Sequence, residues 1–106
     1  MGYAKERKKL EQLLTKIDGI NAYNEKNLLN MVDGHEKYSH TVRILKNKEP
    51  ETFGELYTVE LQEVKDGRKA IKESETDEAR EASFANYKAI IIRAVEKTIK
   101  ITQESV

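Results

Sequence analysis

The segment Lys46 to Glu55, near the midpoint of this 106-residue chain, contains its only proline. Proline has no amide proton and its ring clashes with the preceding helical turn, so Pro50 predicts a break between two helical halves. Folding the chain about residue 50 sets residues 53–64 against 36–47, Ile71 against Leu29, and 84–91 against 9–16. Apolar residues then meet apolar residues. We therefore predict that the second half folds back antiparallel on the first.

Apolar residues recur at three- and four-residue steps in both halves, which is the spacing of one helix face. In the first half these stripes run from about Tyr3 to Ile20 and from Leu28 to Leu45. Asp18-Gly19 separates them as a turn signal. The first half therefore predicts two helices, or one helix with a kink.

The second half predicts two further helices. Thr52 and Glu55 match the T-x-x-E capping box, and a stripe from Phe53 to Ile71 follows. A last helix is expected from about Asp77 to Gln103, with N-cap candidates at Ser74, Thr76 and Asp77.

Composition favours the same fold class, because proline and glycine are scarce and Lys, Glu, Leu, Ile and Ala are abundant. At this length the chain forms one domain, residues 1–106. We predict an all-α fold: an antiparallel helical hairpin or a small three- to four-helix bundle, folded about residues 46–55.

The alternative is an α+β fold. Residues 38–45 are rich in strand-forming types, and apolar and polar residues alternate between Tyr57 and Gln62. Asp66-Gly67 could close a hairpin there. In this alternative 38–45, 56–64 and 68–73 form a small antiparallel sheet, flanked by the N- and C-terminal helices.

Motifs for catalysis are absent from the sequence. The chain has no cysteine, no glycine-rich phosphate loop and no nucleophile elbow. His35-Glu36 and His40 form H-E-x-x-x-H, whose spacing differs from the H-E-x-x-H of zinc proteases. We predict a non-enzymatic protein with no cofactor and no metal site.

The last helix predicts a protein-binding surface. Its apolar side chains spread over roughly 200° of the helix circumference, about twice what a surface helix needs. This surplus favours a protein–protein interaction module: an adaptor, an assembly helper or a small inhibitor. A protein partner or a second copy would contact one side of the helix, at Ala85, Ile92, Val95 and Ile99.

An alternative function is nucleic-acid or nucleotide binding. The formal net charge is zero, but cations concentrate near both ends and carboxylates concentrate in residues 73–81. An antiparallel fold brings the ends together. The expected basic region contains Lys5, Lys8, Lys9, Arg93, Lys97 and Lys100.

The longest apolar run, Ala89 to Ile92, is too short to cross a bilayer, and the N-terminus lacks the apolar core of a secretory signal. We therefore expect a cytoplasmic protein that does not insert in a membrane.

Overall fold

The computed structural model describes residues 3–104, whose regular secondary structure is entirely helical. The helices are α1 (Ala4–Asp18), α2 (Glu25–Lys48), α3 (Pro50–Glu55), the π-helix η1 (Leu56–Glu60), α4 (Leu61–Glu73) and α5 (Asp77–Glu104). The predicted all-α fold is confirmed. The alternative sheet of residues 38–45, 56–64 and 68–73 is wrong, because these segments are helical.

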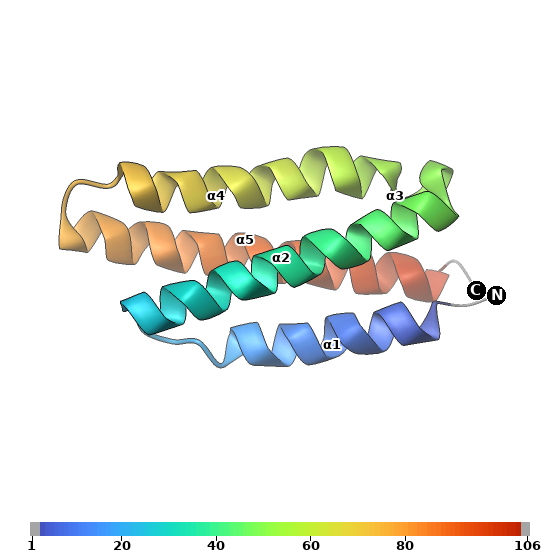
Figure 1. The fold of residues 1–106 in the computed structure, drawn as a ribbon, viewed down its shortest axis with the longest axis horizontal. Helices are drawn as coiled ribbons and strands as arrows, with labels where there is room; N and C mark the ends of the chain where they lie inside the picture. The colour runs from blue at the N-terminus through green and yellow to red at the C-terminus, as the bar shows by residue number, and fades with distance from the viewer. Residues whose placement is uncertain (1–2, 105–106) are drawn as a thin grey trace.

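The helices form an antiparallel bundle of four rods (Figure 1). α3, η1 and α4 follow one another without an interruption and make the third rod. Each rod packs against the next along the chain, and α5 also lies along α1, which closes the bundle. α1 therefore begins and α5 ends at the same end of the molecule (Figure 1).

The predicted break at the only proline is confirmed, and it is short. α2 ends when the Glu49 N–H donates to the Leu45 carbonyl, and Pro50 is the first residue of α3. Proline suits this position because the amide it lacks has no partner in a first turn. The expected capping box at Thr52 is wrong. Thr52 lies inside the first turn, where its own N–H donates to the Glu49 carbonyl at 3.1 Å.

The N-cap of the last helix is one of the three predicted candidates. The Ala79 N–H donates to Thr76 Oγ1 at 3.0 Å, so Thr76 is the cap. Ser74 instead closes α4, because its hydroxyl donates to the Ala70 carbonyl at 2.8 Å.

Burial explains why strand-forming residues adopt helix here. Tyr38, Val42 and Leu45 share one face of α2 and are fully buried. In a strand, residues 38 and 45 would point to opposite sides. The tertiary packing therefore overrides the β-propensity of this segment.

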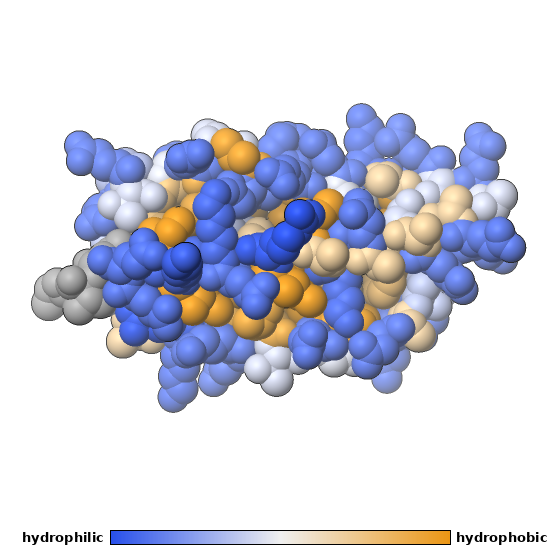
Figure 2. Space-filling model, turned by 180° about the vertical axis from the view of Figure 1, so that it is seen from behind, coloured by the Kyte–Doolittle hydropathy of each residue, from blue (hydrophilic) through white to orange (hydrophobic). Residues whose placement is uncertain are grey.

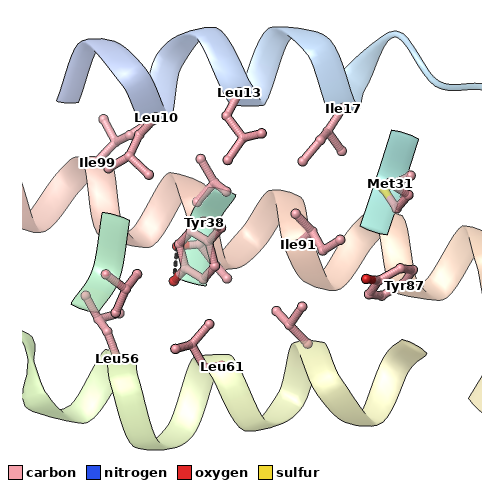
Figure 3. Close-up of a cluster of buried hydrophobic side chains, with 14 of the residues drawn as sticks. Leu10, Leu13, Ile17, Met31, Tyr38, Leu56, Leu61, Tyr87, Ile91 and Ile99 are labelled. Carbon is pink, nitrogen blue, oxygen red and sulfur yellow. Dashed lines mark hydrogen bonds between the residues drawn. The ribbon is translucent and has the colours of Figure 1, made fainter. Parts of the chain in front are cut away.

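Side chains from all four rods meet in one core (Figure 3). The Tyr38 hydroxyl lies 2.9 Å from Thr98 Oγ1 and donates to the Ala94 carbonyl at 3.3 Å, so this buried polar group is satisfied. The predicted contact between Leu29 and Ile71 is wrong. Ile71 is buried, but Leu29 is 69% exposed.

Two of the three Asp-Gly pairs lie inside helices, although this pair suggested turns. Asp18-Gly19 does end α1. A Cβ atom on Gly34 would lie 3.0 Å from Ile17 Cδ1, and one on Gly67 would lie 3.2 Å from Tyr87 Cδ1. These glycines therefore allow α2 to approach α1 and α4 to approach α5, and the predicted hairpin at Asp66-Gly67 is wrong.

Candidate functional site

A groove of about 600 Å³ follows the seam between α2 and α4, which we call the α2–α4 groove. It lies on the side of the bundle where α2 faces the viewer in Figure 1. α2 contributes five lining residues and α4 contributes four: His35, Glu36, Ser39, His40, Arg43, Lys65, Arg68, Lys69 and Lys72. Every one of these side chains is polar or charged.

The charge in the α2–α4 groove is strongly unbalanced. Arg43 and the four cations of α4 line it, and Glu36 is its only carboxylate. Within residues 3–104, none of these five cations makes an ion pair, whereas Lys16, Lys37, Lys48, Arg80 and Lys97 do. The groove is therefore a concentration of uncompensated positive charge.

The α4 cations form a row because of their spacing. Lys65, Arg68, Lys69 and Lys72 follow the i, i+3, i+4, i+7 pattern of one helix face. An adjacent face of α4 carries Leu61, Val64 and Ile71, which are buried in the core. Packing of that apolar face turns the cation row toward α2.

His35 is the least exposed residue that lines the groove, and we call its position the floor of the groove. His35 is only 5% exposed, and its Nδ1 lies 2.8 Å from the Tyr87 hydroxyl oxygen. Burial, together with the charges of Arg68 and Lys65, lowers the pKa of His35 from 6.5 to about 4. The imidazole is therefore neutral at physiological pH. Burial also raises the pKa of Tyr87, so its hydroxyl keeps its proton.

A second groove, of about 500 Å³, lies between α1 and α2 beside the first. It carries three lysines, Lys9, Lys16 and Lys37, and the last two pair with one carboxylate. Asp33 lies 3.2 Å from Lys16 Nζ and 3.1 Å from Lys37 Nζ. Hydrogen bonds from these two lysines lower the pKa of Asp33. Two carboxylates line this groove beside three lysines, whereas one carboxylate lines the α2–α4 groove beside five cations.

The six cations predicted from the chain ends do not form one surface, although the ends come together. Lys9 lies on the α1–α2 side and Lys100 lies between α1 and α5, beside Glu11 and Glu96. Arg93 and Lys97 lie beside Glu60 and Glu63 on the α4–α5 side. Lys5 and Lys8 are exposed on α1.

Lys97 is tied to a buried carboxylate. Its Nζ donates to Oε1 of Glu60, whose side chain is 9% exposed, and this hydrogen bond raises the pKa of Lys97. Glu60 Oε2 is buried and has no partner in the part of the chain that the structure describes. Glu60 lies in η1, where the Leu61 N–H donates five residues back, to Leu56. Lys97 thus has a structural partner within the bundle.

The four α5 residues predicted to contact a partner differ in exposure. Val95 is fully buried and Ile99 is 9% exposed, so both belong to the core. Ile92 is half-buried and Ala85 is exposed. From the side opposite Figure 1, hydrophobic side chains form separate groups among charged ones (Figure 2). The wide apolar arc of α5 can be buried within the bundle because α5 packs against α1, α2 and α4.

No protein-family model, curated protein or solved structure matches this chain. Among residues 3–104, no helix is long and apolar enough to cross a membrane. The same residues contain no group of three or more His, Asp or Glu side chains arranged to hold a metal ion. The function is therefore argued from the grooves and their charges.

Proposed function

We propose that this protein is a non-enzymatic binding protein that holds a nucleic-acid strand by its phosphates in the α2–α4 groove. The observation that carries the proposal is the set of five cations that line one groove without an ion-pair partner among the described residues: Arg43, Lys65, Arg68, Lys69 and Lys72. Like charges held together repel one another, and an anionic ligand relieves that repulsion. Nucleic-acid binding was the alternative expected from the chain ends, and the groove supplies other residues for it.

The shape of the charged surface favours a ligand with several phosphates. The row from Lys65 to Lys72 covers seven residue steps, about 10 Å along the helix axis. One phosphate contacts only part of that length. Arg43 faces the row from α2, so a strand lying along the seam has cations on both sides.

The groove supports phosphate contacts and offers no surface for base recognition. Its lining includes no Phe, Tyr or Trp on which a base could stack. Binding is therefore expected to be independent of sequence and strongly weakened by salt.

The test is fluorescence anisotropy with a labelled single-stranded oligonucleotide over a series of salt concentrations. Lys65→Gln, Arg68→Gln and Lys69→Gln are combined in one groove variant. Removing one phosphate-binding cation lowers the slope of log affinity against log salt by about 0.7, so removing three lowers it by about 2.

The matched control is an end variant that removes the same charge: Lys5→Gln, Lys8→Gln and Lys100→Gln. These side chains are exposed and lie outside the α2–α4 groove. The end variant is expected to keep most of the salt slope. Equal losses in both variants would contradict the choice of the groove, and absence of binding by the wild-type protein at low salt would refute the proposal.

A second candidate is the protein–protein interaction predicted for α5. Hydrophobic groups on the α5 side of the bundle (Figure 2), with half-buried Ile92 and exposed Ala85, favour it. Such a contact would use a smaller apolar surface than expected, because Val95 and Ile99 lie inside. A cytoplasmic location likewise stays a prediction.

A further inference from the structure

We infer that the floor of the α2–α4 groove, where His35 meets Arg68 and Lys65, is a seat for a terminal phosphate, so that a strand is held by a phosphorylated end. This inference rests on the proposed function and specifies the chemical group that the groove selects. It concerns phosphomonoesters, which carry three unesterified oxygens.

The contact between His35 and Tyr87 orients the imidazole. Nδ1 is occupied by the Tyr87 hydroxyl, which has no other hydrogen-bond partner among the described residues. Since that hydroxyl keeps its proton, it donates to Nδ1, and the single proton of the neutral ring lies on Nε2. Because His35 lines the groove, Nε2–H is the polar group that this ring can offer to a ligand there.

Two cations lie close enough to this ring to lower its pKa, Arg68 and Lys65. Arg68 is half-buried, unlike the exposed Lys69 and Lys72 farther out. A guanidinium presents a fork of donors that fits two phosphate oxygens at once. A neutral N–H donor, a guanidinium and an ammonium group therefore line the same groove. On the other helix Glu36 is the nearby carboxylate and His40 is exposed.

The small exposed area of the floor favours a chain end over a backbone phosphate. His35 presents only 5% of its surface, so a group must enter end-on to reach Nε2. A phosphodiester is flanked by sugars on both sides and contacts the outer cations instead. A phosphomonoester has one free end and carries close to two negative charges at neutral pH. The seat therefore discriminates by shape and by charge.

The experiment compares one oligonucleotide with and without a 5′-phosphate, bound to the wild-type protein and to His35→Phe. The aromatic replacement keeps an apolar ring at the floor and removes the donor. The wild-type protein is expected to bind the phosphorylated strand about tenfold more tightly, because a hydrogen bond to a charged group contributes this much. In His35→Phe the two strands are expected to bind with equal affinity.

Two further measurements keep the inference testable if His35→Phe folds poorly. In the wild-type protein, the pKa of His35 followed by NMR rises when the phosphorylated strand binds, because an anion next to the ring favours its protonated form. Inorganic pyrophosphate is expected to lower the affinity for the phosphorylated strand and to leave the affinity for the unphosphorylated one nearly unchanged, because only the first uses the seat. A His35 pKa that does not move overturns the inference.

The two proposals fail in different ways. Equal wild-type affinity for both strands, with weaker binding of both by the groove variant, refutes the terminal seat and keeps the proposed function. No wild-type binding of either strand refutes both. Equal loss of affinity for both strands in a folded His35→Phe protein also refutes the seat.

Discussion

The α2–α4 groove and the outer side of α5 are both rich in cations, but the groove has fewer carboxylates beside them. On the α5 side, Lys97 pairs with Glu60, and Arg93 and Lys100 lie beside carboxylates of neighbouring elements. In the groove, five cations face one carboxylate, Glu36. The difference teaches that the neighbouring helix decides whether a lysine neutralises a carboxylate or remains available to a ligand.

The largest expected effect is the loss of stability when a fully buried residue of α5 is replaced by glutamate, compared with the same replacement at a half-buried position. Val95→Glu places a carboxylate where the side chain is fully buried, which we expect to lower the free energy of unfolding by more than about 4 kcal/mol. Ile92→Glu, at a half-buried position, is expected to lower it by about 1 to 2 kcal/mol. Urea unfolding followed by circular dichroism measures both.

Ile92→Glu also tests the interaction predicted for α5. Light scattering on a size-exclusion column is expected to show the wild-type protein as a dimer or larger and the variant shifted toward monomer, if α5 binds a second copy. A wild-type monomer that captures no protein partner would contradict that candidate. A nearly neutral Val95→Glu would contradict the described core.

The second expected effect is a pH dependence of the free energy of unfolding, caused by His35. In the unfolded chain the imidazole takes up a proton near pH 6.5, but in the folded protein its pKa is about 4. The unfolded state therefore binds more protons in this interval. Lowering the pH from 6.5 to 4 removes up to about 3 kcal/mol of stability through this residue.

Urea unfolding across this pH interval isolates the contribution of His35. His35→Gln is expected to show a flatter dependence, and His40→Gln, an exposed histidine on the same helix, is the control that keeps the wild-type slope. Lysines lower the pKa values of Glu6 and Asp33. In all three proteins, the stability that these carboxylates contribute is therefore lost as the pH falls through their folded pKa values. Identical slopes for wild type and His35→Gln would show that the floor is hydrated.

The smallest expected effect is the difference in stability between replacing Lys97, on the α5 side, and replacing Lys69, in the α2–α4 groove. Lys97→Met leaves the buried carboxylate of Glu60 without a partner, and we expect a loss of about 1 to 3 kcal/mol. Lys69→Met changes stability by less than about 0.5 kcal/mol, because Lys69 is exposed and its removal relieves repulsion. Thermal unfolding measures both variants.

A double variant sharpens this comparison. Glu60→Gln combined with Lys97→Met recovers part of the loss, because the uncompensated charge is gone. A loss at Lys69 equal to that at Lys97 would mean that the two regions do not differ in their use of cations.

Helix periodicity was sufficient to predict most of the fold. The repeats of apolar residues predicted the helices, and Pro50 predicted where the chain turns back. The same reasoning interpreted Asp18-Gly19 and Asp66-Gly67 as turns, although Gly67 lies inside a helix. A glycine at a turn and a glycine at a close helix crossing have the same local sequence, and only the neighbouring helix distinguishes them.

The cation row of α4 could have been predicted from the sequence, but the net charge of the segment hides it. Lys65, Arg68, Lys69 and Lys72 share one helix face, but Glu63, Asp66 and Glu73 lie among them along the chain. Summing charge over a segment cancels this row, whereas projecting it on a helix reveals it. The α2 side of the groove could not be found this way, because it depends on how α2 and α4 are aligned.

The sequence by itself determined the helical class and the antiparallel return at Pro50, because periodicity and proline geometry are local properties. The tertiary structure decided that Val95 and Ile99 are buried, that the cations of α5 lie beside carboxylates, and that His35 contacts Tyr87 in a groove lined by cations. The physical reason is that burial and electrostatic pairing depend on side chains far apart in the sequence. Their positions follow from how helices pack, not from the pattern within any one helix.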